Sequence, residues 1–121
     1  MPTSQVLRAF HGANGNKIVG IMNAGGFMPK NGRVYLSKLL DTFQYGVDSR
    51  RKASFTVLVE VPGPVSVTLR NPPGNPQTLE ISSLGLVRAR VLSLVVRAKH
   101  PWRGFSLSII SSENAIRAFL K

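Results

Sequence analysis

Apolar and polar residues alternate through the middle of the chain. In residues 54–61, SFTVLVEV, apolar side chains occupy every second position from Phe55 to Val61, and the alternation resumes in residues 65–70, VSVTLR, after a Pro-Gly-Pro segment. Successive side chains of a strand point to opposite faces of its sheet, so this period predicts two half-buried strands. Because proline cannot donate to a sheet ladder, the Pro-Gly-Pro segment marks either a hairpin turn or a break at a sheet edge.

The last third of the chain predicts three more strands and a helix. Residues 79–86 and 87–98 are rich in branched apolar side chains, and residues 105–109 alternate between apolar side chains and serine. Residues 71–77, NPPGNPQ, form a loop between the central and later strands. A serine at position 111 or 112, followed by Glu113, is typical of a helix start.

The first part of the chain is more ambiguous. Residues 5–10 and 17–22 predict two opening strands, because the Asn-Gly pair between them tolerates the positive φ angles of a hairpin turn. Residues 23–32 are rich in glycine and predict a mobile loop. Apolar side chains recur at helical spacing in residues 34–43, which predicts a short helix, although residues 34–36 fit a strand equally well.

These elements predict one β-rich α+β domain over residues 1–121, built from two small packed antiparallel sheets with a few short helices. A chain of 121 residues is long enough to bury a core, and it contains no cysteine. The absence of disulfides suits a reducing compartment. Residues 1–20 hold no apolar run long enough for a signal peptide or a membrane span, so we expect the protein in the cytosol or nucleus.

The chain is strongly basic, which bears on its expected partner. The sequence has 16 lysines and arginines against 5 acidic residues, a net charge of +11 at neutral pH. Self-repulsion on this scale destabilises a compact protein, so a polyanion is the expected partner, either nucleic acid or an anionic membrane surface. Hydrophobic residues make up 43% of the chain, which excludes a disordered basic tail.

Cations surround the apolar segment 91–96, VLSLVV, and no acidic residue occurs between positions 87 and 104. A face that serves only solubility normally mixes both signs of charge, and this segment does not. Together with the basic run at 50–52, it indicates a surface that neutralises phosphates without reading sequence; ordinary solubility is the alternative. The candidate nucleic-acid-binding or lipid-binding residues are Arg50, Arg51, Lys52, Arg70, Arg88, Arg90, Arg97, Lys99 and Arg103.

Three large apolar side chains are candidates for contact with a membrane or with another subunit. Trp102 stands in a turn between Pro101 and Arg103, where it either stacks on a base, sits at a lipid interface or caps the core. Phe27 and Met28 lie in the glycine-rich loop. They either insert into a bilayer or a neighbouring subunit, or fold back over the core.

The chain shows no evident catalytic set. A two-histidine ribonuclease needs one imidazole to accept a proton and another to donate one, and nothing in the sequence brings His11 and His100 together. The five acidic residues are scattered over different elements, which indicates neither a carboxylate pair nor an oxygen-ligand metal site. We therefore expect no enzymatic activity, no metal and no cofactor.

Residues 55–84 carry a more specific pattern. Within a series of alternating apolar positions, four short motifs occur at fixed offsets: Phe-Thr, Val-Glu, Gly and Ser-Leu. The matching residues are Phe55, Thr56, Val57, Val59, Glu60, Gly63, Val67, Leu69, Leu79, Ile81, Ser83 and Leu84. This pattern resembles the matrix proteins of bornaviruses and nyaviruses, which are non-segmented negative-strand RNA viruses. The proline-rich loop 71–77 departs from the family pattern, which is more apolar there, and this leaves the pairing of the neighbouring strands open.

The resemblance implies a fold similar to the bornavirus matrix protein and to the N-terminal domain of filovirus matrix proteins. It also implies a homo-oligomer, a tetramer, that binds single-stranded RNA and anionic lipid between the nucleocapsid and the envelope of a virion. In the host cell such a protein occupies the cytoplasm or nucleus and the cytoplasmic face of a membrane. The alternative is a monomeric basic nucleic-acid-binding β domain of the ribosomal or chromatin type, whose sheet edges would be protected from self-association.

Overall fold

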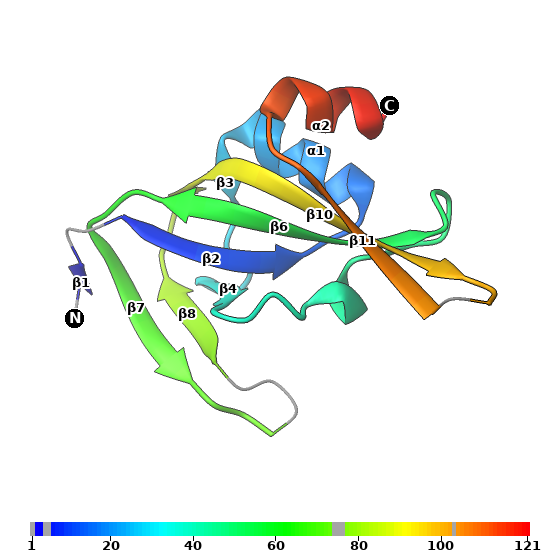
Figure 1. Ribbon diagram of the computed structural model, residues 1–121. Helices are drawn as coiled ribbons and strands as arrows, with labels where there is room; N and C mark the ends of the chain where they lie inside the picture. Colours follow the sequence, from blue (N-terminus) through cyan, green and yellow to red (C-terminus); the bar gives the residue numbers. More distant parts are fainter. Residues whose placement is uncertain (1, 4–5, 74–76, 103) are drawn as a thin grey trace.

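A computed structural model describes residues 2–3, 6–73, 77–102 and 104–121 of the chain. The strands of its main sheet are β1 (Pro2–Thr3), β2 (Leu7–Gly12), β4 (Arg33–Ser37), β5 (Val47–Asp48), β6 (Ala53–Val61), β7 (Val65–Arg70), β8 (Thr78–Ser82), β10 (Arg90–His100) and β11 (Gly104–Ile110). Eight of them follow the order β1-β7-β8-β4-β2-β6-β10-β11, all pairs antiparallel, and β5 pairs with β6 (Figure 1). A second sheet pairs β3 (Gly26–Phe27) with β9 (Val87–Arg88).

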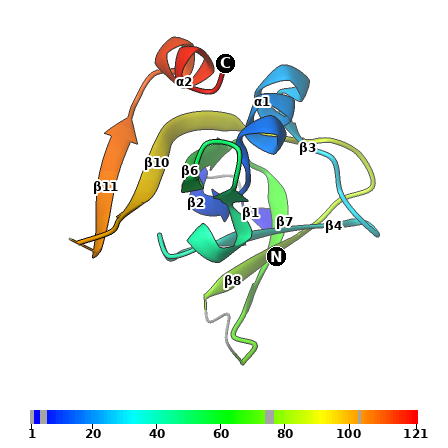
Figure 2. The ribbon, with the colours of Figure 1, turned by 90° about the vertical axis from the view of Figure 1, so that its right-hand side faces the viewer.

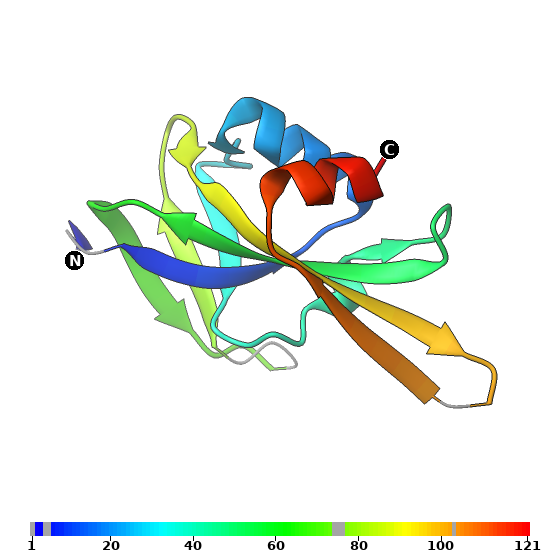
Figure 3. The same cartoon turned by 45° about the horizontal axis from the view of Figure 1, so that its top comes forward.

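The core lies between the main sheet and two helices, α1 (Gly15–Ala24) and α2 (Glu113–Phe119). Both helices contact β10 and lie next to each other over one face of β6 and β10 (Figure 3). Phe55, Val57 and Leu94 point from the sheet into this core, and Ile18 and Ile116 meet them from the helices; all five are fully buried. The fold is therefore a small β-rich domain with two antiparallel sheets and two helices, as predicted, but the sheets are very unequal in size.

The main sheet is strongly bent. In Figure 2, β4 runs nearly across the view, whereas β11, at one end of the strand order, runs nearly upright. The bend lies near β2 and β4, where only Phe10 and Ser37 are paired. A further irregularity between Val91 and Ser93 breaks the register of β10 against β6. A bulge of this kind increases the local twist, and the twisted sheet wraps around one side of the core.

The predicted hairpin at residues 5–22 is wrong, because its second half is the helix α1. Asn14 is the N-cap: its side-chain oxygen accepts a hydrogen bond from the Lys17 amide at 2.9 Å. Gly25 ends the helix with a left-handed φ of 73°. The Asn-Gly pair thus starts a helix instead of turning a hairpin. Asparagine is common both at helix N-caps and in turns, so the residue type alone does not distinguish the two.

The helix predicted within residues 34–43 is also wrong, and the alternative of a strand over residues 34–36 is confirmed. Its first part is the strand β4, in which buried Val34 and Leu36 alternate with exposed Arg33 and Tyr35. A short 3-10 helix, Phe43–Tyr45, follows. This segment approaches the sheet so closely that a Cβ at Gly12 would lie 1.9 Å from the Thr42 carbonyl oxygen. The period-two pattern of β4 prevails because it places two large side chains in the core.

The remaining elements follow the sequence pattern more closely. The strands β6 and β7 and the helix α2 confirm the predictions, and Ser112 caps α2 by accepting the Ala115 amide at 3.1 Å. The strand predicted at 79–86 ends at Ser82 as β8, and residues 83–86 form a loop. The strand predicted at 87–98 divides into β9 and β10. The alternating segment 105–109 is β11, the last strand of the sheet.

Candidate nucleic-acid interface

Carboxylates neutralise several of the predicted binding residues. Glu60 of β6 lies between Arg8 of β2 and Arg90 of β10, with nitrogen–oxygen distances of 3.1 Å and 3.9 Å. Glu80 of β8 similarly accepts Arg33 at 3.4 Å and Arg70 at 3.2 Å. Arg70 and Arg90, which the sequence presents as uncompensated cations, are therefore ion-paired across the sheet. Each shares its glutamate with a second arginine, so they are weaker candidates for phosphate binding than cations with no acidic partner.

Glu80 shows how strongly such a site favours the ionised carboxylate. Glu80 is buried, and burial by itself raises the pKa of its carboxyl group. The hydrogen bond from Arg70 and the charges of Arg33 and Arg70, with a hydrogen bond from the Tyr35 hydroxyl at 3.2 Å, lower the pKa below its ordinary value. This cluster holds β4, β7 and β8 together, so its arginines serve the fold.

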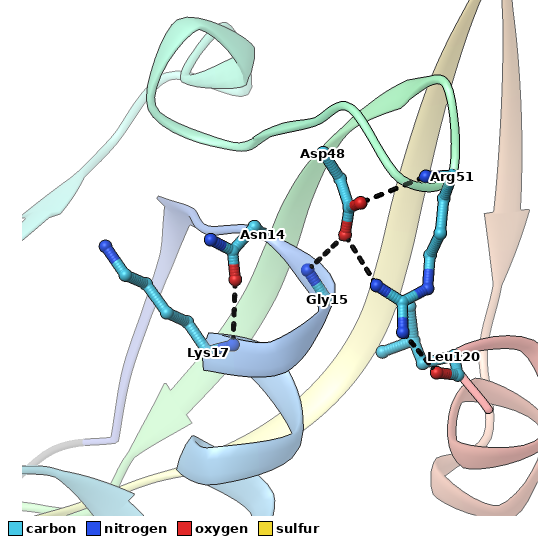
Figure 4. A network of polar contacts seen from close by, with 6 residues as sticks. All are labelled: Asn14, Gly15, Lys17, Asp48, Arg51 and Leu120. Atoms are coloured by element: carbon cyan, nitrogen blue, oxygen red, sulfur yellow. Dashed lines mark hydrogen bonds and ion pairs between the residues drawn. The ribbon is translucent and has the colours of Figure 1, made fainter.

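Arg51 is likewise a structural residue. Its guanidinium donates to Asp48 Oδ2 at 2.7 Å and to the Leu120 carbonyl oxygen at the end of α2 (Figure 4). The same Asp48 oxygen accepts the Gly15 amide at the start of α1 at 2.8 Å. Burial works to raise the pKa of Asp48, but these hydrogen bonds and the Arg51 charge outweigh it and hold the pKa below its usual range. One ion pair thus ties the β5–β6 turn to both helices.

The β5–β6 turn presents Arg50 and Lys52 to solvent. Lys52 has a left-handed φ of 53°, and its amide donates to the Ser49 carbonyl oxygen at 3.3 Å, which closes the turn. The next residues of β6 lie beside β10, with Ser54 opposite Arg97. On its other side Ser54 is opposite Val47 of β5. The register therefore brings the basic turn next to the cations at the end of β10.

Arg97 occupies the centre of this region. Its Cζ atom lies 4.7 Å from the centroid of the Phe43 ring and 4.7 Å from that of the Phe105 ring, so both rings face the guanidinium. Cation–π contacts of this kind fix a guanidinium without neutralising its charge. The buried Nε atom has no hydrogen-bond partner among the described residues. Arg97 is thus a rigidly held cation whose charge is uncompensated.

We define the Arg97 patch as Lys52, Arg97, Lys99 and Phe105. These residues line an open pocket of about 240 Å³, together with Val47, Asp48, Ser49, Ala53 and Ser54. Within the described part of the chain, none of the three cations forms an ion pair with a carboxylate. The only acid at the pocket, Asp48, is occupied by Arg51 and Gly15. The patch is a concave, positively charged surface with an exposed aromatic edge.

A second, larger pocket of about 540 Å³ lies between α1, α2 and the β5–β6 turn. Its four cations are Arg50, Arg51, Arg117 and Lys121. Arg51 is bound to Asp48, and Arg117 is bound to Glu113 at 3.0 Å and to Asn23 at 2.8 Å. Only Arg50 and Lys121 remain there for an external anion, so this pocket is a weaker candidate than the Arg97 patch.

The other predicted residues are not part of the patch. Arg88 lies on β9 opposite Gly26 in the small sheet. Trp102 is 95% exposed at the tip of the β10–β11 hairpin, next to the patch, so it does not cap the core. Met28 is exposed, but Phe27 is buried and packs its ring edge-on against His11 at 4.9 Å, which makes Phe27 a core residue. Arg103 lies outside the described residues.

The two histidines have separate local partners. His11 is mostly buried on β2, and its Nδ1 atom lies 3.1 Å from the Tyr35 carbonyl oxygen. Burial lowers the pKa of His11, against the effect of this hydrogen bond and with a smaller lowering by Lys17. His100 Nε2 lies 2.8 Å from the Ser106 hydroxyl on the β10–β11 hairpin. Among the described residues, no group of three or more His, Asp or Glu side chains could hold a metal ion.

The sequence did not reveal two features of the surroundings of the patch. Phe43 reaches Arg97 from a segment that was predicted to be helical, and nothing in the sequence signals this contact. Ser54 and Val47 enter the pocket only through the pairing of β5 with β6. The free cations at positions 97 and 99, in contrast, were marked by the absence of nearby acids along the chain.

Comparison with family models, with curated proteins and with solved structures found no match for this chain. Neither described helix is long and apolar enough to cross a lipid bilayer.

The different roles of adjacent arginines give a testable prediction. Replacing Arg51→Gln removes the ion pair from buried Asp48, so we expect the free energy of unfolding to fall by about 2–4 kcal/mol. The control, Arg50→Gln, changes an exposed side chain and should stay within about 0.5 kcal/mol of the parent protein. Chemical denaturation measures both. Equal stability of the two variants would show that the Asp48–Arg51 pair does not anchor the turn.

Proposed function

We propose that this protein is a matrix-type scaffold, which binds single-stranded RNA without sequence preference and attaches to the anionic inner leaflet of a membrane. The observation that carries the proposal is the Arg97 patch, where cations without carboxylate partners surround a guanidinium fixed between two aromatic rings. In a virion, such a scaffold lies beneath the envelope and links it to the nucleocapsid.

The chemistry of the patch favours single-stranded nucleic acid. Proteins that bind single strands without sequence preference combine a positively charged groove with aromatic side chains on which bases stack. Lys52, Arg97 and Lys99 supply the charge, and Phe105 is 59% exposed beside them. The indole of Trp102 stands at the end of the same hairpin. Phosphates can therefore meet cations while neighbouring bases meet aromatic faces.

The matrix role draws on two further observations. Residues 55–84, which resemble bornavirus and nyavirus matrix proteins, form β6, β7, β8 and their connections in this chain. Trp102 also suits a lipid interface, where its ring can lie among the headgroups while nearby cations face anionic lipid. Each such cation contributes about 1 kcal/mol near an anionic leaflet, so stable attachment needs several subunits or apolar insertion.

The alternative is a monomeric nucleic-acid-binding module that uses the same patch. The last strand of the sheet, β11, favours the self-associating scaffold, because its outer edge exposes apolar side chains and carries no charge. A monomeric protein normally protects such an edge. Self-association is therefore the property that separates the two candidates.

RNA binding tests the patch with a matched pair of variants. The double variant Lys52→Gln with Lys99→Gln removes two cations from the patch, and Lys17→Gln with Lys30→Gln removes two exposed cations elsewhere. We expect only the first to weaken binding of single-stranded RNA and to reduce the slope of log affinity against log salt by roughly 1.4, at about 0.7 per lost phosphate contact. Equal losses in both variants would mean that net charge alone, and not the patch, binds RNA.

Vesicle flotation tests the membrane contact. We expect the parent protein to float with vesicles that contain anionic lipid and not with neutral ones, because its charge supplies the long-range attraction. Trp102→Ala should reduce flotation, whereas Leu84→Ala, which removes a fully exposed apolar side chain on a distant loop, should not. If the two variants float equally well, Trp102 does not enter the lipid interface.

A further inference from the structure

The β11 strand leaves one end of the main sheet unprotected. Among the described strands it pairs only with β10, so its outer backbone groups have no strand partner. Its seven residues, GFSLSII, include neither a charge nor a proline, which are the usual means of blocking an edge. The other end of the sheet differs, because β7 carries Arg70 and is partly covered by β1.

An apolar stripe runs along β11. Phe105, Leu107 and Ile109 are 59%, 55% and 68% exposed. They lie opposite Lys99, Arg97 and Val95 of β10, so they share a sheet face with the Arg97 patch. The serines at 106 and 108 point to the other face. The strand thus offers unpaired backbone groups and exposed apolar side chains along the same edge.

We propose that β11 pairs antiparallel with β11 of a second copy of this chain, in the register that places Leu107 opposite Leu107. In this register Phe105 of each copy faces Ile109 of the other, because the sequence FSLSI is symmetric about Leu107 in its apolar and serine positions. Cross-strand aromatic–aliphatic pairs stabilise an antiparallel ladder. The strand is therefore complementary to itself, as a two-fold interface requires.

Charge favours a second copy over an acidic partner. The chain carries +11, yet β11 itself is uncharged, so two copies can meet here without placing cations directly opposite each other. An acidic peptide added at this edge would find no cation on the strand that it pairs with. A single pair of seven-residue strands is a small contact compared with stable interfaces, which bury at least about 1,200 Å² in total. We expect a dimer that depends on protein concentration.

The consequence of this pairing for RNA rests on the proposed function. If the Arg97 patch binds RNA, the pairing joins two RNA-binding patches. A two-fold axis between antiparallel neighbours is perpendicular to the sheet, so corresponding side chains of both copies point to the same face. The β10 strands of the two copies are then three strand spacings apart, about 14 Å. One RNA strand that spans this distance contacts both Arg97 patches, which raises its affinity through multivalency.

Disulfide formation between introduced cysteines tests the register, because the natural chain contains no cysteine. Leu107→Cys should form a covalent homodimer under mild oxidation. A mixture of Ser106→Cys and Ser108→Cys proteins should form a heterodimer, since these positions face each other in the proposed register. Directly opposed pairs alternate between wide and narrow spacing in an antiparallel ladder, so one of the two experiments samples the narrow pair that suits a disulfide.

The controls use the same oxidation without RNA. Leu84→Cys places a thiol on a fully exposed loop, and it should give several-fold less covalent dimer than the better of the two β11 experiments. Failure to form a disulfide in both experiments, or equal yields with Leu84→Cys, would overturn the pairing. RNA is absent from this test, so its failure would leave the evidence for the Arg97 patch intact, and loss of RNA binding in patch variants would leave the pairing intact.

Discussion

The scarcity of carboxylates is the constraint on which this structure depends. Five acidic side chains face sixteen cations, so most of the positive charge has no local counter-charge. Four of the acids form ion pairs with six arginines among the described residues. Three of these acids, Asp48, Glu60 and Glu80, lie on strands, where they fix neighbouring strands or helices. The acids therefore decide where positive charge remains free.

The free charge is concentrated by strand pairing. The β5–β6 turn and the β10–β11 hairpin are distant in sequence, and they meet because Ser54 is paired with Val47 on one side and with Arg97 on the other. Asp48 and Arg51 fix the turn against both helices, so Lys52 projects from a rigid support. The rings of Phe43 and Phe105 likewise hold the Arg97 guanidinium in place, through cation–π contacts. A preorganised cation loses less conformational entropy when it binds a phosphate than a mobile one does.

The sequence predicted the strands with strict alternation well and the other elements poorly. Residues 54–61 became β6, whose alternate side chains enter the core, and residues 65–70 became β7, in which Val65 and Val67 pack against the core. Residues 5–22 were assigned to a hairpin because Asn-Gly suits both a turn and a helix start. In the structure Asn14 caps the helix by accepting the Lys17 amide, and Asp48, which is distant in sequence, accepts the Gly15 amide. Within residues 34–43, helical spacing and strand alternation coincide, and burial of Val34 and Leu36 decided the outcome.

The candidate site was predicted only in part, for a similar reason. Local sequence marked Lys52 through the basic run at 50–52, and it marked the cations at positions 97 and 99 through the absence of any acid between residues 87 and 104. It did not reveal that Arg70 and Arg90 meet glutamates of neighbouring strands, because ion pairs across a sheet depend on register. It left open whether Phe27 contacts a membrane or subunit or folds back over the core, and the pairing of β3 with β9 buries it against His11 in the core. The sequence thus identified basic residues without nearby acids along the chain, but it could not identify their partners on distant segments.

We propose that the free positive charge at the Arg97 patch binds single-stranded nucleic acid. The most direct measurement is an amide chemical-shift map of the isotope-labelled protein during titration with a short single-stranded oligonucleotide. We expect the largest shifts on residues 49–54 and 97–105, with small shifts around the Glu60 and Glu80 ion pairs. Shifts spread evenly over all basic segments, or concentrated at Arg33 and Arg70, would contradict it.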